Sequence, residues 1–293
     1  MKWKATYVVC PGGVRTGGPE ALHQLVHELR SLKHDAFIHY VGSEQKPSEY
    51  DCYDTPQATP LDVEDNLVVV PEIWPNMTSG YTRADIAVWW LSPRGIFDVM
   101  RLPRFYNECH HLAQCWATFR QLEDHSPRHL DVLTDYLNPE HFKKRPPGAR
   151  TPRVIWNPGR RGTRMDELLG APGIEYLALE GMSQAEIIEA METSMVYLDL
   201  SVHMAKDRMP REAAIHGCIV LALGINAMAE RGDHAMPWEF LVGRQDTTDD
   251  IESRIRMCLE GYGRFVRYFD SYRDQIRRQR GKFVEEIARI WEL

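Results

Sequence analysis

The sequence has few cysteines and none in a spacing that binds zinc. Six cysteines occur in 293 residues, at positions 10, 52, 109, 115, 218 and 258, and no two form a Cys-x-x-Cys pair. A zinc knuckle or a redox-active pair is therefore not expected. Cys10 and Cys218 lie in apolar runs typical of strands, so we expect buried thiols in a reducing, cytoplasmic compartment.

Long apolar runs and a basic balance are also missing. No run approaches the roughly 20 apolar residues that cross a bilayer, and the short apolar start, residues 5–10, is typical of a first strand rather than a signal peptide. The net charge of −7 lacks the footprint of a nucleic-acid binder, so no nucleic-acid partner is expected. A length of 293 residues suits two α/β domains of about 100–200 residues each.

Several catalytic signatures are absent. The glycines at 12, 13, 17 and 18 form neither the Gly-x-Gly-x-x-Gly dinucleotide fingerprint nor a P-loop. No Gly-x-Ser-x-Gly elbow of a serine hydrolase occurs either. His110 and His111 are adjacent and point apart on any regular element, with no third ligand at helical spacing. The sequence therefore predicts no metal site.

Apolar runs alternate with helical periodicity along most of the chain, which predicts an α/β fold. A basic segment with three prolines, residues 141–152, is the best linker candidate and divides the chain into domains 1–145 and 146–293. From Asp249 onward the chain is expected to be mostly helical. Strands are expected at residues 5–10, 36–41, 66–71, 84–91, 153–156, 174–179, 196–200 and 218–223, and helices at 20–32, 165–169, 183–193 and 211–216.

The stretch from residue 203 to residue 223 is the most informative. It leaves an apolar strand, crosses a charged loop, enters a helix near Arg211 that Gly217 ends, and returns to a second strand. Ligands of parallel sheets bind beyond the carboxyl ends of the strands. Lys206 and Arg208 beside a helix N-terminus suit a phosphate, and the Glu212 carboxylate suits a hydroxylated partner such as a ribose.

The pattern Pro210-x-Glu212-Ala213-Ala214-x-x-Gly217-Cys218 resembles the donor-site loop and helix of GT-B glycosyltransferases, the retaining, nucleotide-sugar-dependent family 4-like (group 1) enzymes. The resemblance implies two Rossmann-like domains facing a cleft, with a C-terminal helix crossing back to the first domain. It also implies that Glu212 holds the nucleotide ribose and that no metal cofactor is needed. The chain departs from the family at Met204, where a second Glu often faces the donor sugar.

On the donor side, the resemblance carries over to a Gly-containing loop, in which Arg160 and Arg164 match the family's spacing of cations. Arginine pairs with phosphate oxygens in a bidentate way. The alternative for Arg160 and Arg164 is a solvated basic surface. The alternative for Lys206 and Arg208 is that they only balance the charges of Asp207 and Glu212. The expected catalytic cations are Arg160, Arg164, Lys206 and Arg208, and the expected donor-binding residues are Gly159, Asp207, Arg211 and Glu212.

The expected acceptor or cleft residues are Gly17, Gly18, Glu72 and Ser92. The Gly-rich segment follows the first strand, where backbone N–H groups approach an anion, although it also suits a turn that needs positive φ. Glu72 ends a strand, and an acceptor-binding or basic role and a capping role are equally compatible with it. Ser92 and Arg94 follow the end of another strand, and a role in acceptor binding and a purely structural role are again equally compatible with them.

The resemblance implies a glycosyltransferase of polysaccharide biosynthesis that moves a sugar from a nucleotide diphosphate sugar to a glycan or lipid-linked acceptor, with retention and without a metal. A peripheral membrane contact stays open, because such acceptors are often lipid-linked. Two rival functions also stay open. One is a non-catalytic, GT-B-shaped nucleotide-binding or scaffold subunit, favoured by Met204. The other is a transferase acting on modified nucleic-acid bases, which the acidic net charge disfavours.

Overall fold

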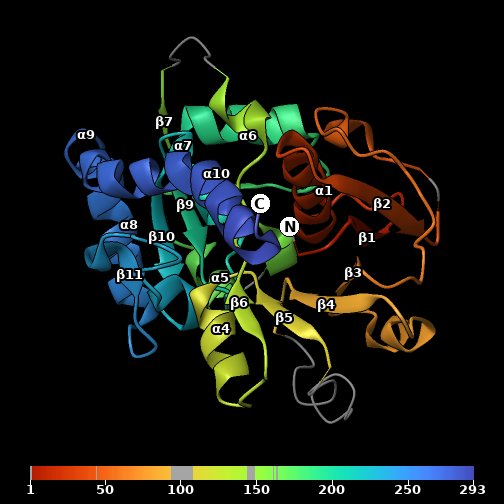
Figure 1. Ribbon diagram of the computed structural model, residues 1–293. Coiled ribbons are helices and arrows are strands. Elements are labelled where there is room, and N and C mark those ends of the chain that lie inside the picture. Colours follow the sequence, from red (N-terminus) through yellow and green to blue (C-terminus); the bar gives the residue numbers. More distant parts are fainter. Residues whose placement is uncertain (1, 44, 94–107, 144–148, 161, 163) are drawn as a thin grey trace. The chain divides into compact units, whose positions relative to one another are not determined.

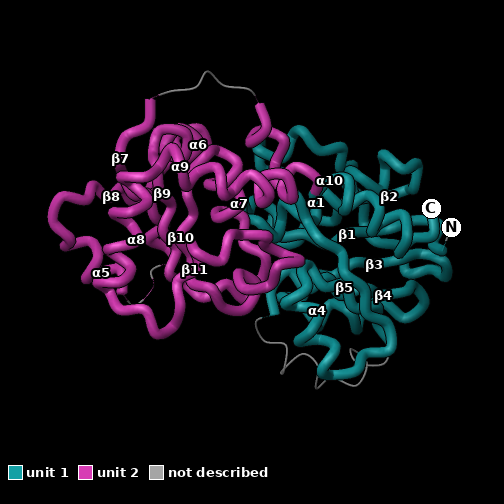
Figure 2. Tube along the Cα trace, turned by 90° about the vertical axis from the view of Figure 1, so that its left-hand side faces the viewer, with its two compact units in different colours: residues 1–136, 279–293 teal, residues 137–278 magenta. Residues whose placement is uncertain are grey.

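The computed structural model describes residues 2–43, 45–93, 108–143, 149–160, 162 and 164–293. The chain forms two compact units (Figure 2). One comprises Met1–Tyr136 with Gln279–Leu293, and the other comprises Leu137–Arg278. The boundary expected at residues 145 and 146 lies outside the described residues. Each unit contains its own parallel sheet, which confirms the α/β class with two separate sheets.

In the first unit the described strands form one parallel sheet in the order β2-β1-β3-β4-β5-β6 (Figure 1). Its strands are β1 (Ala5–Pro11), β2 (Asp35–Val41), β3 (Asn66–Pro71), β4 (Asp85–Trp90), β5 (His110–Ala113) and β6 (Leu130–Val132). Helix α1 (Gly17–Ser31) connects β1 to β2, and α4 (Trp116–Glu123) connects β5 to β6. β3 is buried along its whole length, as expected for a strand covered on both faces.

In the second unit the described strands form a parallel sheet in the order β11-β10-β9-β7-β8. Its strands are β7 (Thr151–Trp156), β8 (Glu175–Ala178), β9 (Ser194–Asp199), β10 (Ile219–Leu223) and β11 (Leu241–Val242). The helices between them are α5 (Met165–Leu168), α6 (Gln184–Thr193) and α7 (Arg208–Ile215). Ser183 and Glu186 form the expected capping box at the start of α6.

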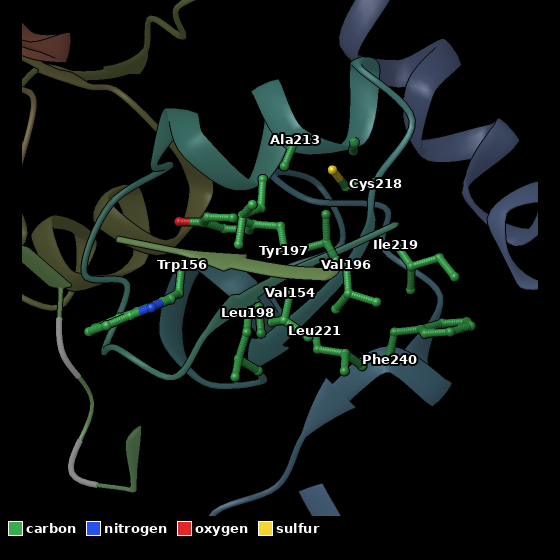
Figure 3. Close-up of a cluster of buried hydrophobic side chains, with 14 of the residues drawn as sticks. Val154, Trp156, Val196, Tyr197, Leu198, Ala213, Cys218, Ile219, Leu221 and Phe240 are labelled. Carbon is green, nitrogen blue, oxygen red and sulfur yellow. The ribbon is translucent and has the colours of Figure 1, made fainter. Parts of the chain in front are cut away.

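The core of the second unit explains the apolar runs in its central strands β7, β9 and β10. Val154, Val196 and Leu221 have no exposed surface and extend from three neighbouring strands, as Figure 3 shows. Phe240 and Ala213 add the contributions of the loop before β11 and of α7. Because helices cover both faces of such a sheet, its strands contain continuous apolar runs rather than alternating ones.

The C-terminal segment is helical, as expected. It comprises α8 (Thr248–Glu260), α9 (Tyr262–Phe265), a 3-10 turn (Val266–Phe269) and α10 (Asp270–Trp291). Residues 279–293 belong to the first unit, where Phe283 packs in the core. There the Glu286 carboxylate accepts hydrogen bonds from Thr134 N at 2.7 Å and Oγ1 at 2.8 Å, and Trp291 Nε1 donates to Thr6 Oγ1 at 3.0 Å. The last turns of α10 thus complete the first unit.

Two helices begin earlier than the periodicity predicts. α1 begins at Gly17 rather than Glu20, so Gly17 and Gly18 lie in its first turn and not in a loop. α7 begins at Arg208 rather than Arg211, because Pro210 is tolerated in the first turn, where its missing N–H has no partner to lose. Glu212 therefore lies one turn inside α7 and not at its start.

No helix in the described ranges is both long and apolar enough to cross a membrane.

Gly217 should be needed for two separable reasons. Its φ of +91° is in the left-handed region, and an added Cβ would lie 2.5 Å from Arg150 Nη2. The Arg150 guanidinium donates to the carbonyl oxygens of Met191, Ser194 and His216, so it has little freedom to move. Backbone strain of this kind costs on the order of 1–3 kcal/mol. We therefore expect Gly217→Ala to reduce the free energy of unfolding, measured by urea denaturation, by at least that amount.

Gly181→Ala is the matched control for this prediction. Gly181 has a φ of +68°, but an added Cβ would meet nothing within 4 Å. It therefore reports backbone strain alone, and the loss in Gly217→Ala should exceed it. Equal losses in the two variants would show that the contact with Arg150 contributes nothing.

Candidate active site

The switch point of the second sheet lies between β7 and β9. From β7 the chain continues to β8 on one side of the sheet and then to β9 on the other side. The loops that follow β7 and β9 therefore leave the carboxyl edge next to each other and in opposite directions, which is where parallel sheets bind ligands. Arg160 follows β7, and the segment from Ser201 to Asp207 follows β9.

Arg160 and Asp207 join these two loops. Arg160 Nη1 donates to Asp207 Oδ2 and Nη2 donates to Oδ1, both at 2.6 Å. Burial by itself lowers the pKa of Arg160, but the Asp207 carboxylate outweighs burial and raises that pKa above its ordinary value. The guanidinium is therefore held as a cation by a bidentate pair.

His203 extends this pair into the interior. Its Nδ1 lies 2.6 Å from Asp207 Oδ2 and its Nε2 lies 3.3 Å from Asp199 Oδ1, and the residue has no exposed surface. Burial alone lowers the pKa of His203, but the two carboxylates reverse that effect and raise the pKa to about 9. His203 is therefore an imidazolium that links two anions at neutral pH.

Asp199 anchors the inner end of the chain at the end of β9. Its carboxylate accepts hydrogen bonds from Tyr197 Oη at 2.9 Å, Ser201 Oγ at 2.5 Å and Ser201 N at 3.1 Å. Burial raises the pKa of Asp199, yet His203 and Ser201 lower it below its ordinary value overall. The alternating charges of Asp199, His203, Asp207 and Arg160 thus run from the core to the carboxyl edge of the sheet. We call them the Asp199–Arg160 chain.

The other cations of the second loop are less exposed than the sequence suggests. Arg211 is fully buried, and it donates to the carbonyl oxygens of Asp207 at 3.1 Å and Lys206 at 3.0 Å. It supports the loop from behind. Lys206 is 4% exposed, while Arg208 is half-buried in the first turn of α7. Of these cations, Arg208 is the most exposed as a whole residue, although its Nε and Nη2 are buried.

Glu212 lies at the end of a chain of imidazoles that the sequence did not reveal. Its Oε1 is 3.4 Å from Nε2 of His141, and Nδ1 of His141 is 3.0 Å from Nε2 of His216. Nδ1 of His216 lies 3.2 Å from Oε1 of Glu192. Glu192 lies in α6, Glu212 in α7 and His141 in the 3-10 turn Pro139–Phe142, and His216 directly follows α7. Glu212 remains half-buried, with a side chain that is 15% exposed.

Arg164 is bound to a third loop at the same edge. Its guanidinium donates to the carbonyl oxygens of Asp246 and Arg244, which follow β11. Carbonyl oxygens are neutral, so these contacts direct the guanidinium without cancelling its charge. Gly159 N donates to Asn157 Oδ1 at 2.9 Å in the tight turn that carries Arg160. Arg161 lies outside the described residues, and Arg244 is a further cation that sequence reasoning missed.

The first unit has an acid at its own switch point, between β1 and β3. Glu72 directly follows β3 and is 6% exposed, and Leu91 N donates to its Oε2 at 3.1 Å. Burial raises the pKa of Glu72 to about 7, although backbone groups of Leu91 and Ser92 act in the opposite direction. A Cβ on Gly18 would lie 3.5 Å from Leu91 Cδ1. Gly18 and Glu72 therefore both lie next to Leu91, and Ser92 contacts Glu72, whereas Arg94 lies outside the described residues.

No protein-family model and no curated protein sequence matches the chain. Solved structures do match it. Sucrose-phosphate synthase from Thermosynechococcus elongatus superposes with a TM-score of 0.71 over 99% of this chain and 98% of that one, at 9% sequence identity. The match extends over nearly the whole length of both proteins. The chain has the GT-B glycosyltransferase fold.

Two further structures with this fold were solved with ligands. TarM from S. aureus, in complex with α-GlcNAc-glycerol and UDP, gives a TM-score of 0.64 at 10% identity over 80% of this chain, which spans only 56% of the TarM chain. An α-glucosyltransferase in complex with UDP and a DNA 13-mer containing an HMU base gives a TM-score of 0.53 at 11% identity over 97% of this chain and 94% of that one. At these identities the likeness establishes the fold.

The raised pKa of His203 predicts a specific pH dependence of stability. The folded-state pKa of about 9 lies above the ordinary value of 6.5. The stabilisation is therefore fully present below about pH 6.5 and is lost as the pH rises through about 9. We expect the Tm of the wild type, measured by circular dichroism, to fall more steeply over this interval than that of His203→Gln. Parallel pH profiles would show that His203 does not titrate in this window.

Proposed function

We propose that the protein is a glycosyltransferase that moves a sugar from a nucleotide diphosphate sugar to a glycan or lipid-linked acceptor. The observation that carries the proposal is the meeting of cationic loops at the switch point of the second sheet, in a chain with the GT-B fold. Fixed cations at this edge suit an anion of the size and charge of a diphosphate.

The chemistry asks the protein to stabilise charge on the departing diphosphate. Preorganised cations in a water-poor site do this without reorganising during the reaction. We assign this work to Arg160, Arg164 and Arg208, with Lys206 contributing from its buried position. Gly159 and Asp207 shape the loops, and Arg211 supports them through backbone carbonyls. Glu212 is proposed to accept hydrogen bonds from the ribose hydroxyls.

The acceptor is assigned to the first unit, at Gly17, Gly18, Glu72 and Ser92. A carboxyl group with a pKa of about 7 can receive or release a proton near neutral pH, so Glu72 is suited to contact the acceptor hydroxyl. The further details remain part of the proposal: retention of configuration, independence of a metal ion, polysaccharide biosynthesis, a cytoplasmic location and peripheral contact with a membrane.

A transferase acting on modified nucleic-acid bases is the alternative that a comparison favours, since one protein of similar fold was solved with DNA. The net charge of −7 disfavours a nucleic-acid acceptor for this chain. A non-catalytic nucleotide-binding or scaffold subunit is the other alternative. It would bind a nucleotide sugar without releasing the nucleotide from it.

Turnover of nucleotide sugars tests the proposal. A thermal-shift panel of UDP, GDP, ADP and dTDP should identify one ligand that stabilises the protein, by roughly 2.7 kcal/mol at about 100 times its Kd. Release of that diphosphate from its glucose and N-acetylglucosamine conjugates, with glycan and DNA acceptors in separate arms, should be detectable and unchanged by EDTA. Arg160→Ala is the control, because it removes a proposed phosphate contact and should suppress release. Binding without release by the wild type would favour the scaffold role.

Glu212→Gln separates a ribose contact from a purely structural acid. A hydrogen bond to a charged group contributes roughly 1.5–3 kcal/mol, so losing the carboxylate should weaken ribonucleoside diphosphate binding about tenfold or more. A 2′-deoxynucleotide should lose much less, because one hydroxyl partner is already missing. Isothermal calorimetry on both proteins with UDP and 2′-deoxy-UDP measures the difference. Unchanged UDP affinity in the variant would remove Glu212 from the ribose site.

A further inference from the structure

Asp207 occupies the N-cap position of α7 without capping the helix. Its backbone is extended, with φ −62° and ψ 148°, but its side chain accepts no hydrogen bond from the first turn. An Asp at this position ordinarily accepts a hydrogen bond from the second or third N–H of the helix. Here both carboxylate oxygens bind Arg160, and Oδ2 also binds His203.

His203 supplies the force that holds the carboxylate in this direction. As an imidazolium it directs Nδ1 to Asp207 and Nε2 toward Asp199, so it bridges two anions that would otherwise repel each other. The Asp207 carboxylate contacts Arg160 and His203, whereas Arg211 donates to the backbone carbonyl of Asp207 instead. His203 itself has no exposed surface and cannot contact a substrate.

Arg160 depends on the same arrangement. The bidentate pair uses one edge of the guanidinium and leaves its remaining N–H groups directed away from Asp207. The side chain of Arg160 is 36% exposed, against 16% for Asp207. An incoming anion can therefore reach Arg160 while Asp207 stays on the inner side of the pair.

We infer that His203 is a positioning residue that keeps the Asp207 carboxylate off the N-terminus of α7 and thereby orients Arg160 toward the diphosphate of the donor. This inference rests on the proposed function. Without the imidazolium, the Asp207 side chain can rotate to accept from the first-turn N–H groups of α7, as an N-cap Asp ordinarily does. The Asp207 carboxylate would then occupy the N-terminus of α7, and Arg160 would lose the partner that fixes its direction.

A double-mutant cycle tests the inference. His203→Gln should weaken binding of UDP about tenfold or more, the size of one charge-assisted hydrogen bond, and leave binding of uridine unchanged. In an Asp207→Ala background the same substitution should change UDP affinity less than about twofold, because its effect passes through the Asp207 carboxylate. Calorimetry with UDP and uridine measures all four proteins, and the diphosphate identified in the thermal-shift panel replaces UDP if it differs.

His34→Gln is the matched control. His34 is also buried and binds one side chain, with its Nε2 2.9 Å from Thr6 Oγ1 in the first unit, and its replacement should leave UDP affinity unchanged. If His203→Gln does not fold, Asp199→Asn removes the anion behind the imidazolium. It should weaken UDP binding in the same direction, again only when Asp207 is present.

The outcomes separate the two levels of the argument. Equal losses in the wild-type and Asp207→Ala backgrounds, or equal losses for UDP and uridine, would overturn the positioning role of His203. A wild-type protein that binds none of the nucleoside diphosphates would instead overturn the proposed function.

Discussion

The second unit depends on one electrostatic constraint, which is that two carboxylates, Asp199 and Asp207, lie on either side of a single buried imidazole. Burying a charge without a partner is strongly unfavourable, so each anion needs its cation. His203 supplies one positive charge between them, and Arg160 supplies the second at the outer end. The four charges cancel in total, yet the outermost group is a cation. The Asp199–Arg160 chain thus has no net charge but places a guanidinium at the edge where the loops after β7 and β9 meet.

The two units solve a similar problem in opposite ways. Each sheet has a switch point, between β1 and β3 in one and between β7 and β9 in the other. In the first unit Glu72 is buried without a cationic partner among the contacts that the structure describes, and burial raises its pKa to about 7. In the second unit Asp199 is equally deep but paired, and its pKa is lowered. Because of that difference in pairing, Glu72 can accept a proton near neutral pH, whereas Asp199 stays an anion.

Periodicity and turn chemistry were sufficient to predict the α/β class, most of the strands and the capped helix α6, because these depend on neighbours in sequence. The short strands β5, β6 and β11 were not among the expected strands. The starts of α1 and α7 were predicted three residues late, since glycine and proline suggested a loop where the structure tolerates them in a first turn. Burial of Arg211 was not predictable from its neighbours. The contacts of Glu212 with His141, and of His203 with Asp199, depend on how the loops fold. The positions proposed for substrate remain predictions.

The acid of the loop before α7 has a different task from the one that the sequence resemblance suggests. Where many GT-B enzymes carry a Glu toward the donor sugar, this chain has Met204, whose sulfur accepts a hydrogen bond from Asn226 Nδ2 at 3.3 Å. The carboxylate of the loop lies instead at Asp207 and faces a cation. The Asp207 carboxylate is held between Arg160 and His203, so it sets the direction of a guanidinium. Under the proposed function, discrimination among donors depends on other groups, and this loop contributes through the diphosphate that UDP-, GDP-, ADP- and dTDP-linked sugars share.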